Sequence, residues 1–182
     1  MTVETIMSRQ PVTISPDTTV AAAVLEMNRH QIHNIPVVDA AGTFVGLFSL
    51  RRLAHALLPM AAQLDEETFH MDIGFLSDTS DEFIRKLQSL GRQPVSQLLE
   101  KKKKLRFCKP STTIPRLLQL LSENPASLPV IVVAGKQKKV VGMVSAWDVL
   151  NKLAMAFLAN QDLSAEASAN RGTPGSGSEK PG

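Results

Sequence analysis

A chain of 182 residues, 43% hydrophobic and 20% charged, can bury one ordinary core or two small units that share one. The net charge of +3 leaves any basic surface to local clustering, and the single cysteine, Cys108, excludes an internal disulfide framework and a multi-cysteine zinc site. No apolar run reaches the ~18 residues of a membrane span and no secretory signal opens the sequence, which predicts a cytoplasmic protein with no membrane contact.

The first predicted elements are a short strand and a helix. The strand covers Val12-Thr13-Ile14, and the segment Pro16-Asp17-Thr18-Thr19-Val20 leads into the helix. Thr18 is a candidate N-cap, because a hydroxyl there can accept a hydrogen bond from a free N–H of the first turn. One buried helix face is indicated by the i, i+3, i+4, i+7 spacing of Val20, Ala23, Val24 and Met27.

Two strands and a second helix complete this unit. The apolar run Ile35-Pro36-Val37-Val38 is typical of a buried strand, and residues 43–49 follow it as another strand after a turn. Leu53 and Leu57, spaced i and i+4, then mark one face of a helix. Residues 1–58 therefore have the order strand, helix, strand, strand, helix.

Residues 59–93 separate this unit from the next and are too many for a plain connector in a compact domain. Within them, residues 80–88 are typical of a helix that Ser80 can cap and Gly91 can end. The buried face of this helix is predicted to contain Phe83, Ile84 and Leu87.

Residues 94–158 repeat the order of the first unit. Pro110-Ser111-Thr112-Thr113-Ile114 echoes the segment that begins at Pro16, with Thr112 as the candidate N-cap, and a strand over Arg106-Phe107-Cys108 precedes it. Leu128-Pro129-Val130-Ile131 matches the run that begins at Ile35, and residues 139–145 match residues 43–49. The apolar helix positions are Ile114, Leu117, Leu118, Leu121, Val149 and Leu153.

The last segment, residues 159–182, is dominated by Ser, Gly, Pro, Ala and Glu, and its part from Ser164 onward has almost no large apolar residue. Such a tail cannot recover its ordering entropy by burying apolar surface, so it is predicted to be disordered.

The two units resemble a tandem CBS domain, or Bateman module. The resemblance rests on the order of the blocks, on the apolar-Pro-Val runs, and on the Gly-x-x-Ser-x-x-Asp element Gly142-Met143-Val144-Ser145-Ala146-Trp147-Asp148. It implies an α+β fold of two βαββα repeats related by pseudo-twofold symmetry, with an inserted helical segment between them. It also implies a regulatory protein, not an enzyme, that binds AMP, ADP, ATP or S-adenosylmethionine between its repeats. The family also includes members that bind nothing detectable.

By this resemblance Asp148 holds the ribose hydroxyls, Ser145 contacts phosphate or sugar, and Met143 and Val144 lie near the adenine. A helix that starts just after Ser145 would also aim free N–H groups at a phosphate. Asp148 could instead be an ordinary first-turn acid and Ser145 only an N-cap. Trp147 is expected to pack structurally and not to stack on a base, since adjacent helix positions point in different directions.

The first copy departs from the pattern, since Arg52 stands where the second copy has Asp148. A guanidinium has no acceptor for ribose hydroxyls, which predicts about one nucleotide per chain. In one kinase-regulating member of the family, residues at the positions of Arg51 and His33 reach the phosphates, and the resemblance assigns both that role here. It also places Val12 on the adenine side. A solvated helix face is the alternative for Arg51 and Arg52, and a surface or strand-end histidine is the alternative for His33.

The run Lys101-Lys102-Lys103-Lys104-Leu105-Arg106 could contact nucleic acid, an acidic partner or the ligand's phosphates, or be a solvated loop. Aromatic residues make up only 4% of the chain, so stacking platforms for single strands are missing. Lys109 lies closer to the expected cleft and is a further candidate ligand contact. Cys108, in an apolar strand, is interpreted as a small core residue.

The leading hypothesis is a sensor of an adenosine-containing ligand, without a resident cofactor or metal, that modulates an unidentified separate protein. The family resemblance implies a homodimer. A ligand-free dimerisation scaffold is the alternative, and nucleic-acid binding through the lysine run is a third.

Overall fold

The computed structural model describes residues 1–58, 80–124 and 128–169. The first repeat contains 3-10 helix η1 (Val3–Thr5), β1 (Ser8–Arg9), α1 (Val20–His30), β2 (Asn34–Val38), β3 (Phe44–Ser49) and α2 (Leu50–Leu57). After α4 (Ser80–Gly91), the second contains η3 (Val95–Leu98), η4 (Lys102–Lys104), β4 (Arg106–Cys108), α5 (Ile114–Ser122), β5 (Val130–Ala134), β6 (Lys139–Val144) and α6 (Ala146–Ala169). This is the α+β architecture expected from the duplicated sequence.

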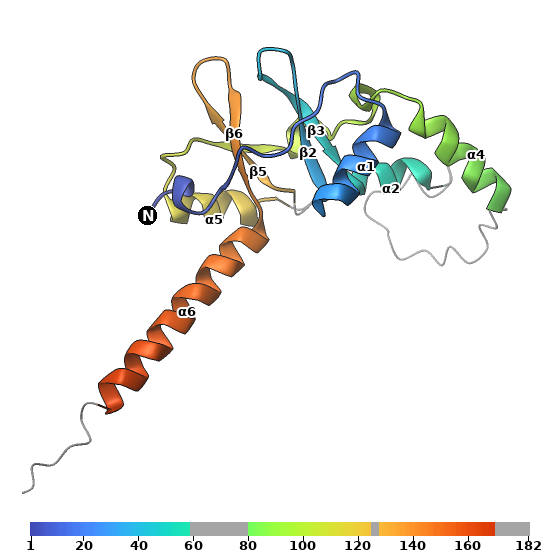
Figure 1. The fold of residues 1–182 in the computed structure, drawn as a ribbon. Coiled ribbons are helices and arrows are strands. Elements are labelled where there is room, and N and C mark those ends of the chain that lie inside the picture. The colour runs from blue at the N-terminus through green and yellow to red at the C-terminus, as the bar shows by residue number, and fades with distance from the viewer. Residues whose placement is uncertain (59–79, 125–127, 170–182) are drawn as a thin grey trace, which may run out of the picture.

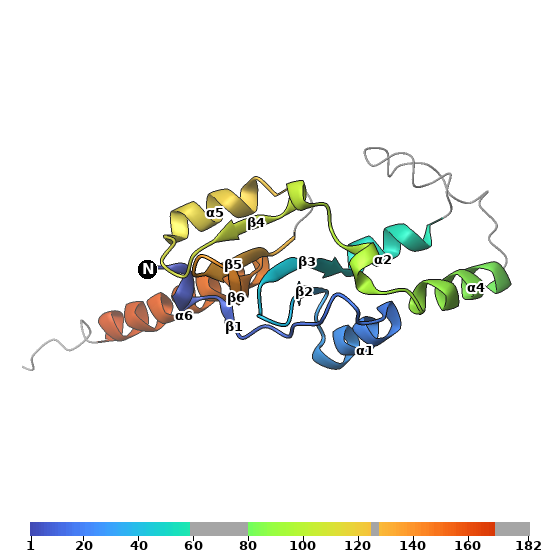
Figure 2. The ribbon, with the colours of Figure 1, turned by 90° about the horizontal axis from the view of Figure 1, so that it is seen from above.

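Two antiparallel hairpins lie at the centre of the molecule, with α1, α2 and α4 at one end and α5 and α6 at the other (Figures 1 and 2). The second hairpin, β5–β6, is extended by β4, parallel to β5, and by β1, antiparallel to β6. The first hairpin, β2–β3, has only a parallel bridge from Ile14 to Val37 in the place of β4. The strand expected over residues 12–14 is therefore reduced to that bridge.

The segment that opens each repeat contacts the other repeat. These opening segments are residues 1–12, with η1 and β1, and residues 94–105, with η3 and η4. Backbone N–H groups of η1 bond to carbonyls of the second repeat, and those of η3 bond to carbonyls of the first. The bonds are Val3 to Thr112 (2.8 Å), Glu4 to Pro110 (3.0 Å), Val95 to Thr18 (2.8 Å) and Ser96 to Pro16 (3.2 Å). This exchange is pseudo-symmetric, because Thr112 and Pro110 are the sequence counterparts of Thr18 and Pro16.

The hairpin register corrects the alignment of the two Pro-containing runs. Ile35 lies opposite Phe48, and the residue in the same place of the second hairpin is Val130, opposite Val144. Both hairpins then have a bulge at the next corresponding step, between Val37 and Val38 and between Val132 and Val133. Pro36 therefore corresponds to Ile131 and not to Pro129, and the sequence match was wrong by two residues.

The predicted N-caps are displaced by one residue. Thr19 precedes α1 and its hydroxyl accepts a hydrogen bond from the N–H of Ala22 at 3.2 Å, as an N-cap side chain does. Thr113 precedes α5 but makes no such bond. Thr112 instead accepts a hydrogen bond from the N–H of Lys109 at 3.0 Å, so it stabilises the turn before the helix.

The core has one cluster in each repeat and a third between them. The central cluster consists of Leu47, Leu105, Leu128 and Ile131, all buried. Phe44 packs against it, and the ring of Phe44 meets that of Phe107 in the other repeat edge to face, with centroids 5.2 Å apart. The two repeats therefore share apolar surface as well as exchanged backbone.

Helix α4 does not bury the predicted face. Phe83, Ile84 and Leu87 are all more than two-fifths exposed, and the buried apolar residue of this helix is Leu90. Lys86 fixes α4 to the end of α2 by donating a hydrogen bond from Nζ to the Leu57 carbonyl at 3.1 Å. The hydrophobic periodicity was read correctly as a helix, but only packing decides which side meets the core.

Helix α6 continues to Ala169, so the structure places residues 159–169 in a helix where the sequence predicts the start of a disordered tail. Residues 170–182 lie outside the described residues. Figure 1 shows α6 leaving the body of the molecule, and residues 151–159 are all exposed. Leu153 is thus exposed, contrary to expectation, whereas Val149 is buried in the second core cluster. Within the described ranges, no helix has the length and apolarity of a membrane span.

Cys108 is buried in β4, as expected of a small core residue. Burial raises the pKa of its thiol, against a smaller lowering by a hydrogen bond from Thr112. The thiol is therefore held in its neutral form, which suits packing and not nucleophilic chemistry.

Candidate functional site

A cavity of about 630 Å³ lies where the opening segment, the end of α1 and the start of α6 meet. Its walls come from both repeats. They comprise Ser8, Pro11, Val12, Gln31, Ile32, His33, Asn34, Pro129, Met143, Ser145, Trp147 and Asp148. The volume lies within the ~300–1,000 Å³ range of small-molecule pockets, and the walls combine apolar side chains with a few polar groups.

The start of α6 presents a carboxylate held in a fixed position. Oδ2 of Asp148 accepts hydrogen bonds from the backbone N–H of Ser145 at 2.7 Å and from its hydroxyl at 2.6 Å. The hydroxyl of Ser145 in turn accepts from the N–H of Asp148 at 3.3 Å. This reciprocal pairing is a capping box, so Ser145 is an N-cap and Asp148 a first-turn acid of α6. It orients the carboxylate before any ligand arrives.

The second oxygen of Asp148 remains accessible to a donor. Among the described residues, Oδ1 receives only the hydroxyl of Ser8, at a long 3.5 Å. Ser8 belongs to β1, which the exchange of opening segments brings beside β6, with Ser8 opposite Met143. A hydroxylated ligand could therefore donate to Oδ1 without displacing a strong internal hydrogen bond.

The opposite wall is formed where α1 turns into β2. Gln31 ends α1 in the left-handed backbone region, with φ 53°, and its N–H bonds to the carbonyls of Asn28 and Met27. This turn aims the segment Ile32-His33-Asn34 toward the cavity, where all three residues line it. The sequence offered no signal for Gln31, because glycine is the usual residue at such a helix end.

Trp147 is placed differently from the prediction. Its side chain is 66% exposed and lines the cavity, so it does not pack structurally. An exposed aromatic ring beside an apolar cavity can cover one face of a planar ligand. The prediction was wrong because the cavity also extends over the helix position next to Asp148, which only the packing of the two repeats decides.

Five of the eight predicted site residues line this cavity, namely Val12, His33, Met143, Ser145 and Asp148. Val144 instead alternates to the core side of β6 and is fully buried. Lys109 is exposed and Arg51 is partly exposed, and neither residue lines the cavity.

Arg51 lies in the counterpart of this site in the first repeat. Its guanidinium contacts Oε2 of Glu100 at 2.7 Å, while the hydroxyl of Ser49 donates to Oε1 of the same carboxylate. The Glu100 side chain is 1% exposed. Ser49 caps α2, since it accepts from the N–H of Arg52 at 3.0 Å, as Ser145 caps α6. In the second repeat, the carboxylate beside the capping serine is Asp148 of the same helix. In the first repeat it is Glu100, which comes from the segment that opens the second repeat.

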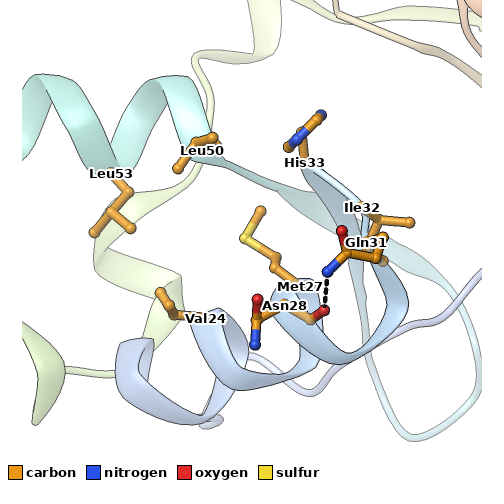
Figure 3. Close-up of a pocket in the computed structure, with 8 residues that line it drawn as sticks. All are labelled: Val24, Met27, Asn28, Gln31, Ile32, His33, Leu50 and Leu53. Carbon is orange, nitrogen blue, oxygen red and sulfur yellow. Dashed lines mark hydrogen bonds between the residues drawn. The ribbon is translucent and has the colours of Figure 1, made fainter.

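A second cavity of about 230 Å³ lies between α1 and α2 (Figure 3). It is lined by Val24, Met27, Asn28, Gln31, Ile32, His33, Leu50 and Leu53, and in Figure 3 the Met27 side chain points into its middle. It shares the wall from Gln31 to His33 with the larger cavity. Its volume lies below the usual range for ligand pockets, so the larger cavity is the stronger candidate.

The lysine run contributes to neither cavity. Lys102 and Lys103 are exposed on η4, consistent with a solvated segment. Within residues 1–58, 80–124 and 128–169, no group of three or more His, Cys, Asp or Glu residues is arranged to hold a metal ion.

Comparison with known proteins identifies the fold. A CBS domain-containing protein of Dictyostelium discoideum is 27% identical over 152 residues, which cover 83% of this chain and 90% of the relative. Among solved structures, CBSX2 in complex with AMP is 18% identical with a TM-score of 0.60, covering 85% of this chain and 97% of that one. The protein of that name is from Arabidopsis thaliana.

A further structure, the CBS domain pair of protein MJ0100 in complex with 5′-methylthioadenosine and S-adenosyl-L-methionine, is 17% identical with a TM-score of 0.61. It covers 86% of this chain and 98% of that one. The family model of the CBS domain matches two segments here, residues 3–59 and residues 95–155. The chain therefore belongs to the CBS domain family and carries two copies of the domain.

Proposed function

We propose that this CBS pair is a regulatory module that binds one adenosine-containing ligand, in the cavity at the start of α6, and modulates a separate protein. The observation that carries the proposal is the Asp148 carboxylate, preset by Ser145 through two short hydrogen bonds and turned toward a cavity of about 630 Å³. A carboxylate in this position can accept hydrogen bonds from both hydroxyls of a ribose, which an alkyl or aromatic ligand would not supply.

The other walls match the remaining parts of such a ligand. Val12 and Met143 provide apolar surface for a purine, and the Trp147 ring can cover its face. His33 lies on the opposite wall, where it can donate a hydrogen bond to a phosphate or a carboxylate. Two structural neighbours are complexes with AMP and with S-adenosylmethionine and its methylthioadenosine relative, which supports the same ligand class here.

Regulation follows from the position of the cavity, whose walls come from both repeats. A ligand that touches both walls binds some arrangements of the repeats better than others, and only such a difference in affinity can shift the arrangement. The exposed surface of α6 begins at this cavity, and a separate protein can bind there.

The test is a calorimetric titration of the purified chain with AMP, ADP, ATP and S-adenosylmethionine. We expect saturable binding of about one ligand per chain by at least one of the four, together with a raised melting temperature. At a free ligand concentration 100 times Kd, the stabilisation should be about 2.7 kcal/mol. Absence of both heat and thermal stabilisation with all four ligands would contradict the proposal.

Trp147 provides an independent optical readout, because it is the only tryptophan of the chain and is 66% exposed. Ligand that covers the ring should change its fluorescence intensity and shift the emission maximum to shorter wavelength, saturating at the calorimetric Kd. The variant Trp147→Phe should retain binding by calorimetry and lose the optical signal. An unchanged emission spectrum at calorimetric saturation would place the ligand away from Trp147.

A second candidate function, a dimerisation scaffold, is favoured by the surface of α6. Six large apolar residues on this helix are 49–67% exposed, namely Trp147, Leu150, Leu153, Met155, Phe157 and Leu158. Together they present on the order of 700 Å² of apolar side chain, close to the ~800 Å² that each partner buries in a standard interface. We infer that a second copy of the chain covers this helix, since an isologous pair would bury both surfaces at once.

Sedimentation equilibrium of the double variant Leu153→Glu/Phe157→Glu tests this contact. Two desolvated carboxylates per copy should weaken dimerisation by at least about 100-fold, because burying an unpaired charge costs several kcal/mol. Leu25→Glu is the matched control, since Leu25 is 68% exposed on α1 and not on α6. A wild-type monomer at high concentration, or a double variant that dimerises as the wild type does, would contradict the α6 interface.

A further inference from the structure

Glu100 is a buried carboxylate that the ligand-binding proposal does not use. Its side chain is 1% exposed, and both oxygens are engaged, Oε1 by the Ser49 hydroxyl and Oε2 by the Arg51 guanidinium at 2.7 Å. Its backbone N–H donates to the Leu47 carbonyl at 2.8 Å. Three contacts thus fix a residue from the second opening segment against the start of α2 in the first repeat.

Glu100 and Ser8 occupy corresponding places in the two repeats. Val3 and Val95 make equivalent backbone bonds to Thr112 and Thr18, which sets the two opening segments in the same register. Counting on from these valines, position 8 corresponds to position 100.

The surroundings agree with this register. Met7 approaches Gly142 as Leu99 approaches Gly46, and these two glycines are themselves counterparts. Ser8 pairs with Met143, and Glu100 bonds to Leu47, which is the counterpart of Met143 in the first repeat.

The two residues have opposite effects on the space beside the capping serine. Ser8 is small and exposed, and it lines the cavity of about 630 Å³ next to Ser145 and Asp148. Glu100 is long, and it fills the corresponding space next to Ser49, which is 1% exposed. Neither of the two cavities is lined by Ser49, Arg52 or Glu100.

One of the two arginines at the start of α2 pairs with this carboxylate, and the other occupies the position of the missing acid. Arg51 pairs with it, and Arg52 replaces the acid that holds the capping serine in the second repeat. The Nε of Arg52 is buried and, among the described residues, has no hydrogen-bond partner. A capping hydroxyl and the Arg51 guanidinium together favour an anion, and the chain supplies one itself in the Glu100 carboxylate.

We propose that Glu100 is a built-in anionic occupant of the first repeat's site, which closes that site and restricts the chain to one ligand. The proposal rests on ligand binding at Asp148 in the second repeat. The sequence predicts one ligand per chain only from the missing acid at position 52. The structure adds a second reason, the buried Glu100 side chain, which is called the plug below. Two changes, not one, then separate the first site from the second.

The test is a cycle of four proteins, the wild type, Arg52→Asp, Glu100→Ser and the double variant, each titrated calorimetrically with AMP and with S-adenosylmethionine. Arg52→Asp restores the acid and keeps the plug, and Glu100→Ser removes the plug without restoring the acid. We expect about one site per chain in the wild type and in both single variants. The double variant should have about two. Circular dichroism and melting temperature establish that each variant is folded.

A folded double variant with no more sites than the wild type would overturn the proposal, and so would two sites in the wild type. A wild type that binds nothing would overturn the site at Asp148. In that case a double variant that gains one site still supports the plug, whereas one that gains none overturns the plug as well.

The converse substitution covers the case in which the double variant does not fold. Ser8→Gln places a long side chain in the second repeat where Glu100 lies in the first, at an exposed position that folding tolerates. We expect affinity to fall at least about 10-fold, with Ser96→Gln, an exposed serine of the other opening segment, as the matched control. Ser8→Gln that binds as tightly as the wild type would overturn the plug.

Discussion

Replacement of Asp148 by asparagine should weaken ligand binding by ~30- to 1,000-fold. The wild-type carboxylate can accept two charge-assisted hydrogen bonds from a ribose, and loss of the charge removes about 2–4 kcal/mol of binding free energy. Asparagine has nearly the same shape, and its amide oxygen can still accept from the N–H of Ser145, so the start of α6 should keep its structure. Calorimetric titration with AMP and S-adenosylmethionine measures the effect.

The matched control for this change is Asp81→Asn. Asp81 is also a first-turn acid, but it lies exposed on α4 and lines neither cavity. Its replacement should leave Kd unchanged within about 2-fold, since a distant surface charge contributes only a screened interaction. If Asp148→Asn binds as the wild type does while the fold is intact, the carboxylate is only a helix cap and the ligand, if any, binds elsewhere.

Replacement of Leu47 by alanine should lower the free energy of unfolding by about 2–5 kcal/mol, the usual cost of a cavity in a well-packed core. Leu47 is fully buried in the central cluster and meets Leu128 and Ile131 of the other repeat. For a chain of this size the melting temperature should fall by roughly 5–15 °C. Urea or thermal unfolding followed by circular dichroism measures the change.

Leu25→Ala is the control, because Leu25 is 68% exposed on α1 and its loss should change stability by less than about 0.5 kcal/mol. Since the central cluster joins the repeats, Leu47→Ala should still unfold in a single transition at a lower temperature. Two separate transitions in the wild type, or a loss below about 1 kcal/mol in the variant, would show that the repeats do not share a core.

Several parts of the site could be predicted from the sequence because they depend on neighbours along the chain. Ser145 and Asp148 are three positions apart at the start of a helix, and that spacing is enough to form a capping box. The absence of an acid at Arg52 was equally visible once the duplication was recognised. Ser145 and Asp148 also line the larger cavity, as the resemblance to the CBS family implies.

Other parts could not be predicted, because contacts between distant residues decide them. The wall from Gln31 to Asn34 and the residues Trp147 and Asp148 line one cavity only after the two repeats pack together. The two-residue error in matching the Pro-containing runs has the same origin, since strand register is set by the partner strand and not by local composition.

The sequence alone determined the duplication, the order of helices and strands, and the presence of one complete Gly-x-x-Ser-x-x-Asp element, since helical and strand periodicity and capping act over a few residues. Only the tertiary structure decided that the opening segments are exchanged, that Ser8 lies beside Asp148, and that Glu100 is buried beside Ser49 and Arg51. The physical reason is that these contacts join residues up to 140 positions apart, and their formation depends on how two apolar cores share one interface.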